Sequence, residues 1–259
     1  MTFMKGTRFL DVQSAQVADY GFVGDREFVL VTDRGALLGP DQHAPFLPLL
    51  FDFDSAADRL TLHLPDGTSV SERLQLAGRT VELDYLGMRH IALRKVLGQW
   101  DNRLAQFSGM KVKLYRCERS GAGIDVKPIT LLTTGSLRHL AERLGVDVDH
   151  RRFRANIIIE HDTPHVEDEW EGAILAAGDV RLRVLASVPR CVVTQLDPDT
   201  GVQNQGVVRA LQGYRDRVRL PDGLMPSYRT PGFASYAEVI SPGRVAVGDT
   251  ISVERAATD

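Results

Sequence analysis

Cysteine is scarce in this sequence. Cys117 and Cys191 are the only two among 259 residues. On their own they cannot form a four-ligand zinc or iron–sulfur site, which needs two further protein ligands. A disulfide would join them only in an oxidising compartment, and the chain shows no secretion signal. Each cysteine is therefore interpreted as a free thiol, either packed in a core or used in chemistry.

Long apolar runs and an excess of positive charge are also missing. No run approaches the ~20 apolar residues that span a bilayer, and residues 1–6 contain no apolar signal core. We therefore expect no membrane segment and a cytoplasmic location. The formal net charge of −3 argues against nucleic-acid binding through a broad basic surface. The remaining composition, 43% apolar and 25% charged, is typical of a soluble globular protein.

Several familiar catalytic motifs are absent from the sequence. It has no G-x-x-x-x-G-K-[ST] loop, no G-x-G-x-x-G after a strand and no G-x-S-x-G elbow. His161 and His165 are separated by Pro164, so they cannot share a helix face and are interpreted as exposed loop residues. The acidic run at residues 167–169 is interpreted as a solvated loop, because a general base needs a neighbouring acid or nucleophile.

Strand patterns dominate the chain. Apolar or β-branched residues alternate with polar ones in four segments, residues 27–32, 59–64, 180–185 and 244–248. Residues 155–159 are continuously apolar after Asn156, which is typical of a strand buried on both faces.

Helical patterns are fewer. Val96, Leu97, Trp100, Leu104 and Phe107 fall on one helical face. Residues 137–144 form a second helical pattern, with Thr133, Thr134 and Ser136 as candidate caps and Gly145 as a stop, and residues 207–214 predict a third. The sequence thus predicts a mainly β (α+β) fold of barrels with packing helices. We expect an N-terminal domain over residues 1–90 and a second domain over residues 91–259.

The candidate functional residues lie between residues 152 and 201. Arg154 and Asn156 precede the apolar strand, and Arg190 and Cys191 precede a second apolar stretch. The planar guanidinium of arginine donates paired hydrogen bonds to phosphate, and asparagine can both donate to and accept from a heterocycle edge. Cationic neighbours lower a thiol's pKa and favour the thiolate, which ligates soft metals. Together these residues suit an anionic, heterocyclic, sulfur-binding cofactor.

Each of these residues also has an ordinary structural explanation. A lone Cys191 is more often a buried structural thiol, a lone Arg154 a surface ion pair and a lone Asn156 a strand-end residue. The segment 197–201, Asp-Pro-Asp-Thr-Gly, is on its own a common turn. Residue chemistry by itself therefore favours these structural explanations over a cofactor site.

Two motifs in this stretch resemble the signatures of MOSC domains, a family named for the C-terminal domain of molybdenum-cofactor sulfurases. Residues 152–157, Arg-Phe-Arg-Ala-Asn-Ile, resemble the family's R-F-R-P-N-I, with Ala155 in place of the usual proline. Arg190-Cys191, six residues before the segment 197–201, resembles its R-C-…-D-P-D-T-G motif, although Val188 and Pro189 replace a more polar or thiol-containing pair.

The resemblance extends over nearly the whole chain. Residues 236–249 resemble the family's closing strands. Residues 4–6 and 24–28 resemble segments of the β-barrel domain that precedes MOSC in the amidoxime-reducing component type. In that type, a full strand precedes the segment that corresponds to residues 4–6. In this sequence only four residues precede Lys5. The N-terminal barrel is therefore expected to lack part of its start, and Lys5 to be poorly held.

The resemblance implies specific roles for residues of this chain. Cys191 becomes the thiolate ligand of molybdenum, in a molybdenum cofactor (molybdopterin). Arg154 and Asn156 become pterin or phosphate contacts. Arg190 and Asp197 of the second motif are the other predicted cofactor-binding residues of the MOSC domain. The first domain supplies phosphate-end contacts through Lys5, Gly6 and Arg26.

The function implied is an oxidoreductase that reduces N-hydroxylated or N-oxide small molecules by oxygen-atom transfer to molybdenum. Since two cysteines cannot hold a plant-type iron–sulfur cluster, a separate electron donor, a reductase or a ferredoxin-like protein, is expected. An alternative is a sulfur carrier or cofactor-handling protein with a persulfide on Cys191, without the pyridoxal-phosphate domain of cofactor sulfurases. A third hypothesis is a β-barrel scaffold that binds no cofactor.

Overall fold

The computed structural model describes residues 1–85, 87–218 and 230–254 of the chain. The strands are β1 (Ser14–Ala18), β2 (Gly21–Phe22), β3 (Phe28–Thr32), β4 (Leu50–Asp54), β5 (Arg59–His63), β6 (Ser69–Arg73), β7 (Leu76–Tyr85), β8 (Arg89–Val96), β9 (Val112–Cys117), β10 (Ile129–Thr133), β11 (Ile157–Ile159), β12 (Ile174–Ala177), β13 (Val180–Pro189), β14 (Gly232–Ser241), β15 (Gly243–Ala246) and β16 (Ile251–Glu254). The α-helices are α1 (Trp100–Ser108), α2 (Thr134–Leu144) and α3 (Val207–Gln212). The prediction of a mainly β fold with packing helices is confirmed.

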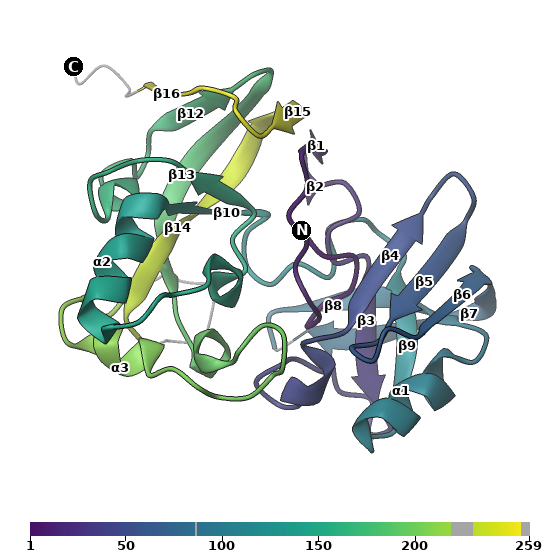
Figure 1. The fold of residues 1–259 in the computed structure, drawn as a ribbon. Coiled ribbons are helices and arrows are strands. Elements are labelled where there is room, and N and C mark those ends of the chain that lie inside the picture. Colours follow the sequence, from purple (N-terminus) through teal and green to yellow (C-terminus); the bar gives the residue numbers. More distant parts are fainter. Residues whose placement is uncertain (86, 219–229, 255–259) are drawn as a thin grey trace.

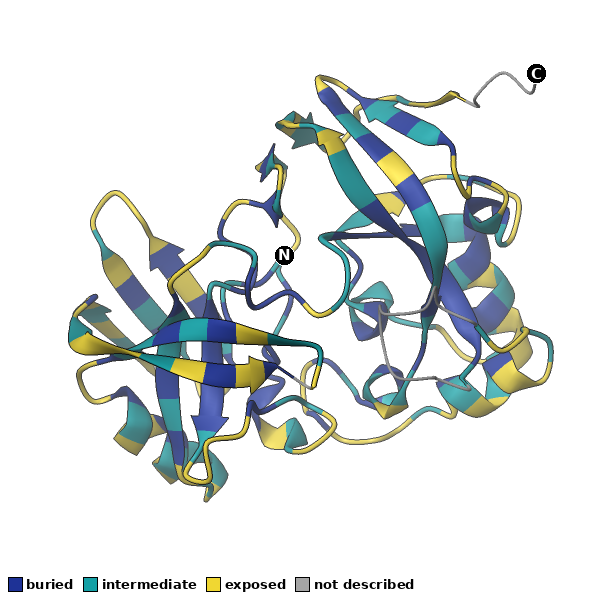
Figure 2. Ribbon diagram, turned by 180° about the vertical axis from the view of Figure 1, so that it is seen from behind, coloured by how far each residue is buried: buried dark blue, intermediate teal, exposed yellow. Residues whose placement is uncertain are grey.

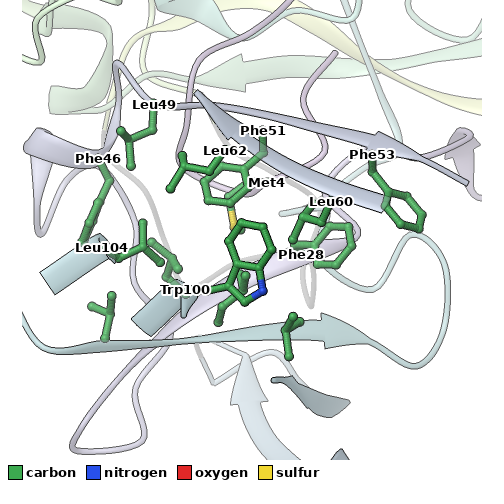
Figure 3. Close-up of a cluster of buried hydrophobic side chains, with 14 of the residues drawn as sticks. Met4, Phe28, Phe46, Leu49, Phe51, Phe53, Leu60, Leu62, Trp100 and Leu104 are labelled. Carbon is green, nitrogen blue, oxygen red and sulfur yellow. The ribbon is translucent and has the colours of Figure 1, made fainter. Parts of the chain in front are cut away.

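One half of the molecule is built from two sheets and a helix. The sheet β3-β9-β8-β7 and the hairpin sheet β4-β5-β6 enclose an apolar core with α1 (Figure 1). Trp100 from α1, Phe28 from β3 and Phe51 from β4 are fully buried there and lie side by side with Met4 (Figure 3). Residues along β4 alternate between buried and exposed, as a strand with one face on a core requires (Figure 2).

The other half is a curled sheet in the order β11-β10-β14-β13-β12-β16, covered at one end by α2 and α3 (Figure 1). Register shifts along the β13–β14 pair, between Val184 and Pro189, bend the sheet into a half-barrel. Val17 and Phe22 of β1 and β2 pack into its core, and β1 pairs with β15. The first strands of the chain therefore complete the C-terminal half.

The helix predictions are largely confirmed, although α1 begins later than predicted and α3 ends at Gln212, two residues before the predicted end. Thr133 caps α2 by accepting a hydrogen bond from the Ser136 amide, and Gly145 ends it with a left-handed φ of 69°. The first helix begins at Trp100 and not near Val96, because Val96 is the last residue of β8 and Gly98, with a φ of 120°, turns the chain between them.

Two predictions about residues 155–169 are wrong. β11 is an edge strand, and Ile158 is 37% exposed, so this strand is not buried on both faces. Glu167 is not in a solvated loop. It is 1% exposed, and its Oε2 accepts hydrogen bonds of 2.8 Å from the hydroxyls of Thr133 and Ser136. The carboxylate thus fastens the 3₁₀ turn Val166–Asp168 to the start of α2.

The first residues of the chain run between the two halves (Figure 1). The Lys5 amide donates to the Phe28 carbonyl at 2.9 Å, and the Arg26 amide donates to the Thr2 carbonyl at 2.7 Å. Lys5 is 8% exposed and Met4 is fully buried. The expectation that Lys5 is poorly held is therefore wrong, because backbone pairing with residues 26–28 and burial of Met4 hold the segment.

Candidate active site

A cavity of about 260 Å³ brings together most of the predicted site residues. Its lining comes from both halves of the molecule, which places cationic and sulfur-bearing side chains around one space. The predicted residues in the lining are Lys5, Gly6, Arg26, Arg154, Arg190 and Cys191. The cavity is at the small end of the range for small-molecule sites.

Three residues in this lining adopt a left-handed backbone. Gly6 has a φ of 83°, and Arg26 and Arg154 each have a φ of 53°. A non-glycine residue in this region is uncommon, and such strain gathers at functional sites. Arg154 ends the 3₁₀ turn His150–Phe153, and Arg26 follows the turn that leads into β3. The local chain reversal brings each arginine into the cavity wall.

The buried cations of the N-terminal half have carboxylate partners. Lys5 forms an ion pair with Asp125, which also accepts a 2.9 Å hydrogen bond from the Tyr85 hydroxyl. Arg26 pairs with the buried Asp25. Burial disfavours the charge on Arg26, but Asp25 and Asp125 outweigh it and raise the pKa of Arg26 above its ordinary value. Lys5 differs: burial lowers its pKa, and Asp125 offsets this only in part.

Arg154 is only partly satisfied. Its Nη1 donates to the Thr7 carbonyl at 2.8 Å, and its guanidinium lies 4.6 Å from the centre of the Phe9 ring, which also contacts Arg26. Its Nη2 is buried and has no hydrogen-bond partner among the described residues. Burial and the nearby charge of Arg26 lower the pKa of Arg154 to about 9. A buried cation with an unused donor is costly by itself and suits an anionic ligand.

Arg190 fixes the chain just before the cysteine. Its Nε donates to the Phe233 carbonyl at 2.7 Å and its Nη1 to the Phe153 carbonyl at 2.9 Å, while its buried Nη2 has no partner in the described part of the chain. Burial lowers the pKa of Arg190 to about 10. This side chain ties the end of β13 to β14 and to the turn that carries Arg154.

Cys191 is a half-buried thiol between β13 and the 3₁₀ turn Val192–Gln195. Burial raises the pKa of the thiol, and the charge of Asp41 adds to this, while the Val193 amide and Arg190 counter it. The expectation that neighbouring arginines produce a thiolate is therefore wrong for the protein alone, because desolvation dominates. A bound metal ion would itself favour the thiolate. No group of three or more His, Cys, Asp or Glu placed to hold a metal occurs within residues 1–85, 87–218 and 230–254.

Residues 118–252 match the family model of the MOSC domain. The chain belongs to the MOSC domain family. The match begins directly after β9 and ends inside β16, so it includes Cys191, Arg154 and all of the half-barrel sheet except the end of β16.

Curated relatives of this MOSC protein carry amidoxime-reducing names. It is 32% identical over 139 residues to human mitochondrial amidoxime-reducing component 1, which covers 53% of this chain and 40% of the relative. It is 35% identical over 130 residues to rat mitochondrial amidoxime reducing component 2, covering 49% of this chain and 37% of the relative. A longer match, to the Xenopus laevis component 1, is 26% identical over 276 residues and covers 96% of this chain and 78% of the relative. In the human and rat matches, the MOSC chain therefore spans less than half of the relatives' length.

Solved structures give weaker matches. The crystal structure of the YuaD protein from Bacillus subtilis has a TM-score of 0.36 and 13% identity, covering 94% of this chain and 97% of that chain. The crystal structure of YiiM from Geobacillus stearothermophilus has a TM-score of 0.29 and 18% identity, covering 51% and 56%.

Two predicted contacts of the MOSC motifs lie outside the cavity lining. The Asn156 Oδ1 accepts a 3.0 Å hydrogen bond from the Thr130 amide, and its Nδ2 donates to Asp25 at 3.2 Å. Asp197 organises its own turn, where it accepts hydrogen bonds from the Thr200 amide and the Asn204 side chain, both at 3.0 Å. These bonds are structural, and direct contact of either residue with a cofactor stays a prediction.

Sequence reasoning missed several residues of the MOSC cavity. Asp125, Tyr236 and Asp41 line this space, and Asp125 also accepts a hydrogen bond from the Tyr85 hydroxyl. Burial raises the pKa of Tyr236 to about 12, so its phenol keeps its proton at neutral pH. Tyr236 belongs to the closing-strand segment that was recognised by resemblance, whereas Asp41 and Asp125 sit in loops without a motif.

Proposed function

We propose that the protein is a molybdenum-cofactor-dependent oxidoreductase that reduces N-hydroxylated small molecules. One observation carries the proposal: the guanidinium of Arg154, whose Nη2 is buried and unused, lines the same cavity as the Cys191 thiol. A phosphate or pterin group would accept a hydrogen bond from Nη2 of Arg154, and a soft metal would bind the sulfur of Cys191. Membership of the MOSC family and the amidoxime-reducing names of its relatives support this choice of cofactor and reaction.

The side chains in the lining fit such a cofactor. Arg154, Arg26 and Lys5 would supply positive charge for its phosphate end, and Cys191 would supply a sulfur ligand for the metal. When bound, the molybdenum cofactor supplies two-electron oxygen-atom transfer chemistry.

The residues of this chain position the reactants. Reduction of an N–OH group to N–H consumes two electrons and two protons and releases water. Arg190 holds the Cys191 segment against β14 through the Phe233 carbonyl. Tyr236 keeps its phenolic proton at neutral pH and so can donate a hydrogen bond inside the cavity.

Electrons are expected to come from a separate protein. The two cysteines of the sequence are too few for a plant-type iron–sulfur cluster. We therefore include an external donor, a reductase or a ferredoxin-like protein, in the proposal. No helix in the described ranges of the chain is both long and apolar enough to cross a bilayer.

The test compares wild type with Cys191→Ser, both purified from a host that makes the cofactor. With a chemical reductant as donor, wild type should convert benzamidoxime to benzamidine. The variant should lose activity by on the order of 100-fold or more, since even outer partners of a metal cost up to that factor. Cys117→Ala, which removes a thiol outside the cavity lining, is the matched control and should keep its turnover.

Two results would overturn the proposal. Equal turnover by Cys191→Ser and wild type would remove the thiol from the mechanism. A cyanide-releasable sulfur on Cys191, with no metal-dependent turnover in either protein, would instead identify a sulfur carrier.

A further inference from the structure

An exposed carboxylate, that of Asp41, lines the same cavity as Cys191. Asp41 belongs to the loop of residues 37–43 that follows β3, and it shares the cavity lining with Cys191 and Thr194. The loop is fixed by hydrogen bonds from the Leu38 amide to the Leu30 carbonyl at 2.9 Å and from the Gln42 amide to the Gly39 carbonyl at 3.1 Å. A fixed loop holds the carboxylate in a defined place.

The carboxylate of Asp41 has no ion-pair or hydrogen-bond partner among the described residues. The other acidic side chain in the lining, Asp125, is already paired with Lys5 and Tyr85. Asp41 is therefore an unused anionic acceptor in the cavity lining that it shares with Cys191.

The cavity lining carries charge of both signs. Lys5, Arg26 and Arg190 are buried cations, Arg154 is a half-buried one, and Asp41 is an exposed anion. A ligand with an anionic group would be drawn to the arginines. A second ligand with a cationic group would be drawn to Asp41.

We propose that Asp41 is a specificity-determining residue that binds the cationic head of amidinium- or guanidinium-type substrates and products in the cavity that Cys191 also lines. A planar N–C–N cation presents two N–H groups to one carboxylate, which is the geometry of a bidentate ion pair. Neutral N-oxides offer no such donors and gain nothing from Asp41. That the protein reduces such N-hydroxylated substrates rests on the proposed function. Binding of the cation by Asp41 does not depend on it.

The first test measures binding, with full-length protein purified from a cofactor-competent host. Benzamidine, which is cationic at neutral pH, is compared with the neutral isostere benzamide by titration calorimetry. Asp41→Asn keeps the shape and removes the charge. It should weaken benzamidine binding about threefold to tenfold, as expected for a partly exposed ion pair, and leave benzamide unchanged. Asp33→Asn, an exposed aspartate outside the lining, is the control and should change neither.

The second test separates binding from turnover in the same preparations. For a cationic N-hydroxyguanidine, Asp41→Asn should raise KM and leave kcat unchanged, and for a neutral N-oxide it should change neither. Equal benzamidine affinity in wild type and Asp41→Asn, or no measurable affinity in wild type, would overturn the assignment of Asp41. Loss of affinity in the variant without turnover in either protein would uphold Asp41 and contradict the proposed function.

Discussion

At the scale of single residues, the site depends on side chains that are unsatisfied in the protein alone. Arg26 and Arg154 both adopt a left-handed backbone and share the ring of Phe9. The Nη2 atoms of Arg154 and Arg190 are buried and have no partner among the described residues. A buried polar group without a hydrogen-bond partner reduces the stability of the fold. We interpret them as the part of the fold that is completed by a ligand.

Replacing Arg154 tests this interpretation. Arg154→Gln removes the buried charge and should weaken binding of pyrophosphate, a probe for the phosphate end, by about 10-fold to 100-fold, the equivalent of ~1.5–3 kcal/mol for a hydrogen bond to a charged group. Calorimetry of the cofactor-free protein measures it. Arg138→Gln, an exposed arginine paired with Asp162, is the control. Equal affinity in Arg154→Gln and wild type would show that Arg154 does not receive the anion.

The two thiols should differ in reactivity. Burial raises the pKa of Cys117 to about 12 and also raises that of Cys191, but Cys191 is half-buried and Cys117 is buried. In cofactor-free protein, iodoacetamide should therefore modify Cys191 first. Its rate should lie below that of a free cysteine at pH 7 and increase toward alkaline pH, since a raised pKa moves thiolate formation to higher pH. Faster modification of Cys117, followed by peptide mass spectrometry, would refute the ranking.

At the scale of elements, local sequence patterns predict those strands and helices whose formation depends on residues close together in the chain. Alternation found the strands at Phe28–Thr32 and Arg59–His63, and capping residues found α2 with its stop at Gly145. The exposed face of β11 was missed because three successive isoleucines carry no alternation. The buried role of Glu167 was missed because its partners lie 31 and 34 residues away in the chain.

The candidate site was predictable only in part, for the same reason. Cys191 and Arg154 were found through chemistry and resemblance. Asp125 and Asp41 were not, since neither lies in a motif and each gains its meaning from residues on other segments. The raised pKa of Cys191 could not be predicted either, because burial is a tertiary property.

A glycine in the loop after β9 shows how closely elements pack at the site. A Cβ added at Gly123 would lie 2.1 Å from the Arg26 carbonyl oxygen, and the Gly123 carbonyl accepts a 3.0 Å hydrogen bond from Tyr85. Gly123→Ala should therefore displace Arg26, destabilise the fold by ~1–3 kcal/mol and weaken pyrophosphate binding. Urea unfolding and calorimetry measure the two effects.

Gly78 provides the matched control. A Cβ there meets nothing within 4 Å, so Gly78→Ala should change stability by no more than about 0.5 kcal/mol. If both alanine variants behave alike, close packing against Arg26 is not what requires glycine at position 123.

At the scale of the whole molecule, the site exists because distant parts of the chain meet. β1 pairs with β15 across more than two hundred residues, and the segment around Lys5 lies against residues 26–28 between the halves. Lys5 and Arg26 thereby reach the same cavity as Arg154 and Cys191. The predicted division at residues 90 and 91 falls inside β8, and it stays a prediction.

The most direct test is the molybdenum and pterin content of the full-length protein from a cofactor-competent host. Molybdenum is measured by mass spectrometry of the metal, and pterin by fluorescence of its oxidised form. Wild type should contain both in equal amounts that approach the amount of protein. Cys191→Ser should keep pterin through the arginines and lose affinity for the metal, while Arg154→Gln should lose both. Wild-type protein with no more molybdenum or pterin than an unrelated protein from the same host would contradict the account.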